Sequence, residues 1–231
     1  DAKRNFESFL SIYRSRDDMY RWARDEVISC DWALEHKNDT AEYEILKPDS
    51  GMNTIHAEMS PYLYDSNTLY LSTMRYEKDE VKKNNPVFVE VQKMVRDSGI
   101  WIIAELDLPI ADEDAHVGNG TFSADSSRFY FSKCPDFGSC SIYVTKNKGG
   151  TWNEPSSLPE PVNVANATNT QPTIAKIGED EFLIFASNRS TGKGGMDLWF
   201  VPLKNGEPTS RLRNMGNNVN TKGDEITPYF D

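Results

Sequence analysis

Residues 182–199 read FLIFASNRSTGKGGMDLW, and this stretch decides the fold. Its first half, 182–189, is a burst of aromatic and β-branched residues that ends in Ser, Asn and Arg. A Gly-rich turn follows, and a second apolar burst begins at Asp197. Short apolar bursts bounded by Gly, Ser and Asn are typical of β-strands joined by a loop. The stretch therefore predicts two consecutive strands rather than a helix.

The same pattern occurs twice upstream, as LYLSTMR at 69–75 and FYFSK at 129–133. Ser72, Ser132 and Ala186 hold the same place in the three copies, and the intervals between them are 60 and 54 residues. A small polar turn precedes each burst, and a second type of strand follows it. The turns lie at 58–62, 118–122, 170–174 and 224–229, and the second strands at 101–105, 141–144 and 197–201.

A repeat of about 40 to 60 residues that contains several short strands is the signature of β-propeller blades. Residues 37–231 are therefore predicted to hold about three blades and the start of a fourth. Three blades and a fragment do not close a ring, so we expect the remaining blades to follow Asp231 or to come from a partner chain. Residues 1–36 differ, because their apolar residues recur at three- and four-residue spacing. They are predicted to be a helical pair that ends a helical repeat region, with Asp17 capping the second helix.

The quoted stretch, and NMGNNVNTKGDE at 214–225, resemble the WD40-like, TolB-type propeller repeats and the joint between their blades. The resemblance covers about residues 50–231. It implies a mainly β, WD40-like β-propeller, incomplete in this segment and preceded by an α-helical pair. Such joints are typical of bacteroidete envelope proteins with tetratricopeptide-type helices before the propeller and often an OmpA-like, peptidoglycan-binding domain after it. Some members are accessory lipoproteins of type IX secretion and gliding motility.

Two departures from the family pattern stand out. The second copy has Gly120 where Pro is usual, and the first copy carries an insertion at 77–95. That insertion is interpreted either as a partner-binding loop or as an extended hairpin.

The net charge limits the kinds of partner that the protein can bind, and the cysteines indicate its cellular compartment. The formal net charge is -11, which offers no positive face to a nucleic acid or an anionic membrane. No apolar run is long enough for a transmembrane segment. Cys134 and Cys140 bracket a turn between two strands, and a disulfide there would require an oxidising compartment. The alternative is a pair of reduced thiols. With the resemblance, this predicts the periplasm, in association with the outer membrane.

Several further motifs are candidates for structural roles. Asn147, Gly149 and Trp152 resemble the Asp-box of sialidase-type propellers, a local hairpin-stabilising turn. Asp197 is expected to accept backbone N–H bonds in a blade turn. Asp224 and Glu225 are expected in the joint between blades, with calcium binding as the weaker alternative. Thr40 lies in an Asp-Thr-Ala pattern that resembles the bacteroidete O-glycosylation sequon. His56 and His116 occupy comparable positions before successive blades, where either a turn hydrogen bond or a shared metal would suit them.

The functional expectation is a non-enzymatic scaffold or adaptor that binds protein partners in an envelope complex. Peptidoglycan would be bound only through a domain outside this segment. We predict no catalytic residue, no metal and no cofactor, because the repeated polar residues suit turns and joints and nothing unrepeated resembles a nucleophile beside a base. Two alternatives remain: a sialidase-like propeller glycoside hydrolase, which needs convergent carboxylates, and a glycan-binding module that uses exposed Trp101 or Trp199.

Overall fold

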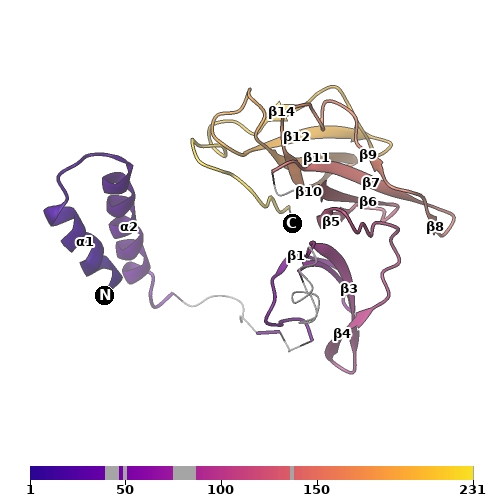
Figure 1. The fold of residues 1–231 in the computed structure, drawn as a ribbon, viewed down its shortest axis with the longest axis horizontal. Helices are drawn as coiled ribbons and strands as arrows, with labels where there is room; N and C mark the ends of the chain where they lie inside the picture. Colours follow the sequence, from indigo (N-terminus) through magenta and orange to yellow (C-terminus); the bar gives the residue numbers. More distant parts are fainter. Residues whose placement is uncertain (40–46, 49–50, 75–86, 136–137, 231) are drawn as a thin grey trace. The chain divides into compact units, whose positions relative to one another are not determined.

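The computed structural model describes residues 1–39, 47–48, 51–74, 87–135 and 138–230. The chain divides into two compact units, Asp1–Lys47 and Pro48–Asp231. The first unit is helical and the second is built of β-strands (Figure 1). A mainly β fold preceded by a helical pair, as the sequence predicts, is therefore present.

The helical unit is a pair of consecutive helices that pack against each other. They are α1 (Ala2–Ile12) and α2 (Asp18–Glu35). The Asp17 carboxylate accepts a 3.3 Å hydrogen bond from the backbone N–H of Tyr20, which confirms the predicted N-cap. The rings of Phe6 and Trp22 meet edge to face with their centroids 6.1 Å apart, and Ala23 is buried beside them. Among the described residues, neither helix is long and apolar enough to cross a membrane.

The described residues of the second unit form three sheets that follow one another along the chain. In each sheet the strands are antiparallel and lie in sequence order, as in a meander. The first sheet consists of β1 (Glu58–Asp65), β2 (Thr68–Thr73), β3 (Glu90–Asp97) and β4 (Ile100–Ala104). The second consists of β5 (His116–Phe122), β6 (Arg128–Cys134), β7 (Ser141–Lys148) and two short strands that both pair with β7, β8 (Thr151–Trp152) and β9 (Ser156–Ser157). The third consists of β10 (Asn169–Ile177), β11 (Asp180–Ser187), β12 (Asp197–Lys204), β13 (Glu207–Pro208) and β14 (Arg213–Asn214). The two short strands β13 and β14 both pair with β12.

The first sheet corrects one element of the sequence interpretation. Residues Glu90–Val95 of β3 pair with the whole of β2, as β7 pairs with β6 and β12 with β11. Residues 90–95 are thus the third strand of the sheet, although the sequence places them in an insertion at 77–95. The run at 101–105, taken as the equivalent of 141–144, instead forms most of β4, a fourth strand at the edge. Residues 77–86 lie outside the described residues.

Apolar side chains fill the interfaces between successive sheets. One buried cluster joins the first and second sheets through Tyr70, Val117, Phe122 and Phe129, and a second joins the second and third sheets through Tyr130 and Phe185. Successive sheets therefore bury their facing sides against each other, which is how repeated units without a core of their own become stable. Trp101 and Trp199 are 9% and 6% exposed, so neither ring offers the open face that the glycan-binding alternative requires.

The structure gives a physical reason for Gly120. Pro61, Gly120 and Pro172 occupy equivalent places in β1, β5 and β10, and in the paired strand Leu69 and Leu183 correspond to Phe129. A Cβ atom on Gly120 would lie 1.9 Å from Cζ of the Phe129 ring. The second copy therefore has a phenylalanine where the other two have leucine, and a glycine in place of proline leaves room for its ring.

Candidate functional site

Four equivalent residues with left-handed backbone conformation converge on one place. Ser60, Asn119, Gln171 and Thr227 have φ values of 50°, 53°, 54° and 54°. The first three lie where the register of β1, β5 and β10 shifts against the next strand. Thr227 holds the same place in the extended segment 224–230. All four line a single hollow of about 90 Å³. Non-glycine residues in this region are strained, and such strain clusters at functional sites.

Buried serines hold the bulges of neighbouring sheets together. Ser72 Oγ accepts a 2.8 Å hydrogen bond from the N–H of Asn119, and Ser132 Oγ accepts a 2.9 Å bond from the N–H of Gln171. These are the serines whose spacing reveals the repeat. The third copy has Ala186 at this position, and there the N–H of Thr227 donates to Oε1 of Gln171 at 2.8 Å. The repeated serine is therefore a joint between sheets.

A larger and mainly apolar cavity of about 310 Å³ lies next to the four residues and shares Asn119 and Gln171 with their hollow. Its wall includes the pair Cys134 and Cys140 and several apolar and hydroxyl side chains. The remaining lining residues are Met59, Val89, His116, Gly118, Ser132, Thr168, Thr170 and Met196. Two thioether groups and a disulfide make this wall polarisable and suited to aromatic or aliphatic groups. The amides and hydroxyls at its border can hydrogen-bond a backbone or a polar group.

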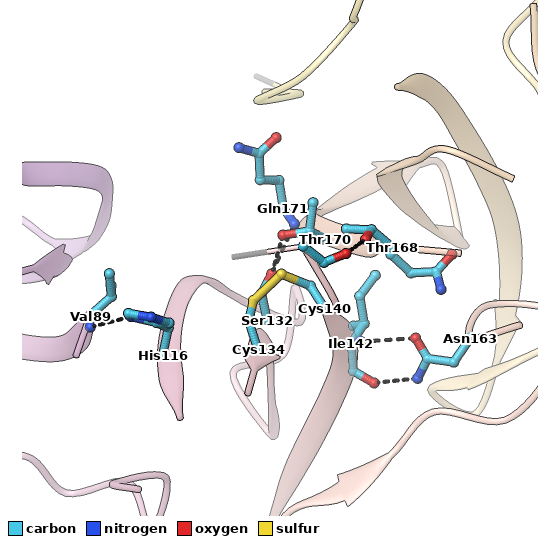
Figure 2. The surroundings of a disulfide bond; sticks show 12 residues. Val89, His116, Ser132, Cys134, Cys140, Ile142, Asn163, Thr168, Thr170 and Gln171 are labelled. Atoms are coloured by element: carbon cyan, nitrogen blue, oxygen red, sulfur yellow. Dashed lines mark hydrogen bonds between the residues drawn. A yellow bond between two sulfur atoms is a disulfide. The ribbon is translucent and has the colours of Figure 1, made fainter. Parts of the chain in front are cut away.

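Cys134 and Cys140 form a disulfide whose Cα atoms are 4.1 Å apart, at the end of β6 and just before β7 (Figure 2). Both cysteines are more than nine-tenths buried. The carbonyl of Cys140 accepts a 2.9 Å hydrogen bond from the N–H of Asn169, the first residue of β10. The disulfide thus links the β6 and β7 ends of this wall, and the Cys140 carbonyl ties the wall to the third sheet.

His116 lies directly opposite Cys134 in the pairing of β5 with β6. Its Nδ1 accepts a 3.0 Å hydrogen bond from the N–H of Val89 (Figure 2), so the neutral ring carries its proton on Nε2. The carbonyl of Val89 accepts a 2.7 Å bond from the N–H of Val117. Because Val89 and His116 are 27 residues apart in the sequence, this is not the expected turn hydrogen bond; it ties the residue just before β3 of the first sheet to β5 of the second.

Two asparagine side chains hydrogen-bond to the backbone of a strand as a neighbouring strand would. Asn163 accepts from the N–H of Ile142 and donates to its carbonyl, at 2.9 and 2.8 Å (Figure 2). Asn220, which is fully buried, makes the same pair of bonds with Leu198, at 2.9 and 3.0 Å. Asn220 thus holds the segment 214–225 against β12 of the third sheet.

The Asp-box-like turn lies in the β7–β8 hairpin and not at the cavity. Oδ1 of Asn147 accepts a 2.9 Å hydrogen bond from the N–H of Gly150, and Gly149 has a φ of 63° that favours glycine. The half-buried Trp152 packs on Phe122 of β5. These contacts are structural.

Asp197 and Asp224 also bind the backbone. Asp197 is fully buried and accepts from the N–H groups of Lys193 and Gly194 at 2.6 and 3.1 Å. Asp224 accepts a 2.7 Å bond from the N–H of Met196, which belongs to the cavity wall. Glu225 accepts a hydrogen bond from the Thr221 hydroxyl.

Thr40 lies outside the described residues. Within the part of the chain that the structure describes, no group of three or more His, Cys, Asp and Glu side chains is arranged to hold a metal ion.

Tyr70 and Asp107 form a tyrosine–carboxylate pair within the second unit, the kind of pair that a sialidase-like glycosidase would require. The Tyr70 hydroxyl donates to Asp107 at 2.9 Å, and Lys93 donates to the same carboxylate at 2.9 Å. Burial, then the bond to Asp107, raises the pKa of Tyr70 far above its ordinary value. Burial opposes ionisation of Asp107, but the bonds from Lys93 and Tyr70 outweigh it and lower its pKa. The phenol stays protonated, which is the opposite of an activated nucleophile.

Sequence reasoning identifies the polar turns before each burst but misses that they form one site. Ser-Pro, Asn-Gly, Gln-Pro and Thr-Pro at 60–61, 119–120, 171–172 and 227–228 signal turns. In the structure they are bulges inside or beside strands, and only the spatial arrangement of the sheets brings them together. The recurrence of a polar residue before Pro or Gly in every copy is the signal that could have located them.

Comparison with known proteins adds little. No protein-family model matches the sequence, and no curated protein matches it. Among solved structures, similarity is found to an α-L-arabinofuranosidase from Lactobacillus brevis, with 14% sequence identity and a TM-score of 0.39 over 67% of this chain and 52% of that one. A second, titled glycoside hydrolase, has 14% identity and a TM-score of 0.37 over 67% of this chain and 51% of that one. The chain thus spans about half the length of either, and similarity at this level carries no argument about function.

Proposed function

We propose that this protein is a non-catalytic adaptor whose sheets are blades of a WD40-like β-propeller, and that it binds a polypeptide partner at the cavity beside the four left-handed residues. The observation that carries the proposal is the convergence of Ser60, Asn119, Gln171 and Thr227. In a propeller the first strand of each blade lies nearest the axis. Equivalent bulges in successive first strands would therefore face a common centre.

The size and chemistry of the cavity favour one anchoring side chain over an extended sugar. Ligand pockets usually hold about 300 to 1,000 Å³, and this cavity, at about 310 Å³, stands at the low end of that range. Met59, Met196 and the disulfide provide an apolar wall for an aromatic or aliphatic side chain. The side-chain amides of Asn119 and Gln171 lie at its border, where they could bind the backbone of the partner.

The disulfide supports a location in an oxidising compartment, because such bonds are rare in the cytosol and common in the periplasm. We infer a periplasmic protein associated with the outer membrane and part of an envelope complex, such as type IX secretion or gliding machinery. The net charge of -11 supports protein partners over nucleic acid.

A glycoside hydrolase is the competing function, and carboxylate chemistry distinguishes the two. Hydrolysis requires a carboxylic acid and a second carboxylate or tyrosine free to react with one substrate. Asp197 and Asp224 instead bind backbone N–H groups of the Gly-rich turn at 192–196. Tyr70, beside Asp107, is held in its protonated form.

Partner capture with matched variants tests the proposal. Met59→Trp fills the cavity from β1, whereas Leu63→Trp places the same ring on an exposed position of the same strand. We expect envelope proteins captured by the parent protein to be lost with Met59→Trp and retained with Leu63→Trp. Equal capture by both variants would contradict the site. Turnover of aryl glycosides or sialosides that a single carboxylate substitution abolishes would contradict the non-catalytic function.

A further inference from the structure

The edge strand β4 differs from the edges of the other two sheets. In the second sheet the outer positions are taken by β8 and β9, which have two residues each and are separated by Pro155. In the third sheet they are taken by β13 and β14, which also have two residues each, and Pro208 lies in β13. Very short strands and prolines are common devices against edge-to-edge pairing. In contrast, β4 is an unbroken strand of five residues without proline, lysine or arginine.

The side chains of β4 are unusually apolar for an exposed strand. Ile100, Ile102 and Ile103 are 56%, 44% and 56% exposed. Since side chains alternate along a strand, Ile102 and Ile103 stand on opposite faces of the first sheet. An added strand could therefore pack β-branched residues against isoleucine on both faces.

The hairpin geometry shows which backbone groups of β4 point outward. Ser98 and Gly99, with φ values of 51° and 86°, form the two-residue turn between β3 and β4, and Asp97 pairs with Ile100 across it. The pair that closes such a turn is hydrogen-bonded, and bonded pairs alternate with non-bonded ones. The backbone groups of Ile102 thus point to β3, and those of Ile103 point away from it. Among the described residues, no other strand pairs with this outer edge.

We propose that the outer edge of β4 accepts one extended strand from a basic partner protein, which adds to the first sheet as a fifth strand. Strand addition of this kind takes its affinity from main-chain hydrogen bonds and its specificity from alternate side chains. The surface is separate from the cavity of the proposed function, and it does not depend on that function.

Charge selects the partner. Asp97 and Glu105 are exposed near the two ends of β4, so a strand with Lys or Arg at its ends would be complementary. A second copy of this chain would bring the same acidic ends and a net charge of -11 against another -11. Like charge of this size opposes self-association.

The test uses the whole protein and a synthetic peptide of alternating Val and Thr with two lysines at each end. Binding is measured by fluorescence anisotropy, and backbone exchange is measured residue by residue by NMR. We expect saturating peptide to slow exchange of the Ile103 amide at least tenfold and to leave the Ile102 amide unchanged. Protection at Ile102 alone, protection confined to the cavity residues, or no binding would overturn the proposal.

Two variants of one residue separate the backbone from the side chain. Ile103→Pro removes the isoleucine side chain and an outward N–H, a loss that an edge strand tolerates. It should weaken binding about tenfold more than loss of the side chain alone, as expected for one lost hydrogen bond. Ile103→Ala keeps the N–H and should weaken binding less than Ile103→Pro does. Equal losses would overturn the proposal, as would sedimentation showing that the parent protein pairs with itself through this edge. Met59→Trp should leave peptide binding unchanged, so failure here and failure of the cavity site are distinguishable.

Discussion

Gly120→Ala is expected to destabilise the β-unit through a single, identified clash. The added Cβ would lie 1.9 Å from Cζ and 2.6 Å from Cε1 of Phe129, whose ring is fully buried and has no room to turn away. Overpacking of a closed core costs about 1 to 3 kcal/mol. Because this overlap is severe, we expect the free energy of unfolding to fall by about 3 kcal/mol. In a domain of this size that corresponds to a fall in Tm of roughly 6 to 12 °C.

The repeat supplies the compensating change. The first and third copies have leucine where the second has Phe129, so Phe129→Leu should make room for a side chain at Gly120. Phe129→Leu alone should cost about 1 kcal/mol, and adding Gly120→Ala to it should cost little more. Urea unfolding of the two single variants and the double variant should therefore give a coupling of about 2 kcal/mol.

Gly223→Ala is the matched control, because its Cβ would meet only the Thr221 hydroxyl at an ordinary 3.4 Å. It should change the free energy of unfolding by about 0.5 kcal/mol or less. If Gly120→Ala is as mild as this control, or if the two changes at Gly120 and Phe129 simply add, the explanation of the missing proline is wrong.

Three further predictions concern the joints and turns. Peptides from unreduced protein should show the Cys134–Cys140 link by mass spectrometry, and replacing both cysteines with serine should cost about 2 kcal/mol in urea unfolding; free thiols in the native protein would contradict the oxidising compartment. Hydrogen bonds from the hydroxyls of Ser123 and Ser127 lower the pKa of the exposed Asp125 to about 2. Above pH 4 the ionised carboxylate therefore stabilises the folded state by under about 1 kcal/mol, and this stabilisation is lost as the pH falls through 2. Asp125→Asn should therefore lower Tm more at pH 7 than at pH 2, where about half of the folded-state carboxylates are protonated, and a constant difference would refute this. Arg189 donates to backbone carbonyls and lies over two aromatic rings, so Arg189→Lys should cost about 3 kcal/mol, and a loss below 1 kcal/mol would contradict its role as a clamp.

The repeat could be predicted from sequence because its signal is local. The bursts around Ser72, Ser132 and Ala186 combine β-branched and aromatic residues with turn residues, and each forms the predicted strand. The sequence does not reveal β3 as readily, because Glu90–Asp97 mixes charged and apolar residues, as a half-buried strand does. The more apolar run in β4 matches the pattern of the strand that follows each burst, although it lies at the exposed edge of the sheet.

The candidate site could be predicted only in part. The turn residues and the cysteine pair are visible in the sequence, because turns and close cysteines depend on short-range geometry. The convergence of Ser60, Asn119, Gln171 and Thr227 depends on how whole sheets pack, over separations of more than 50 residues. No local pattern specifies such an arrangement, so the cavity beside these residues becomes visible only in three dimensions.

Photo-crosslinking from the cavity wall tests the central claim most directly. A photoreactive residue in place of Met196, which lines the cavity, is compared in intact cells with one in place of Ile177, an exposed position at the end of β10. The account predicts a covalent adduct to one polypeptide from position 196, mapped by mass spectrometry to a single apolar or aromatic side chain, and no such adduct from position 177. The same adduct from both positions, or none from position 196, would contradict binding of a polypeptide at this cavity.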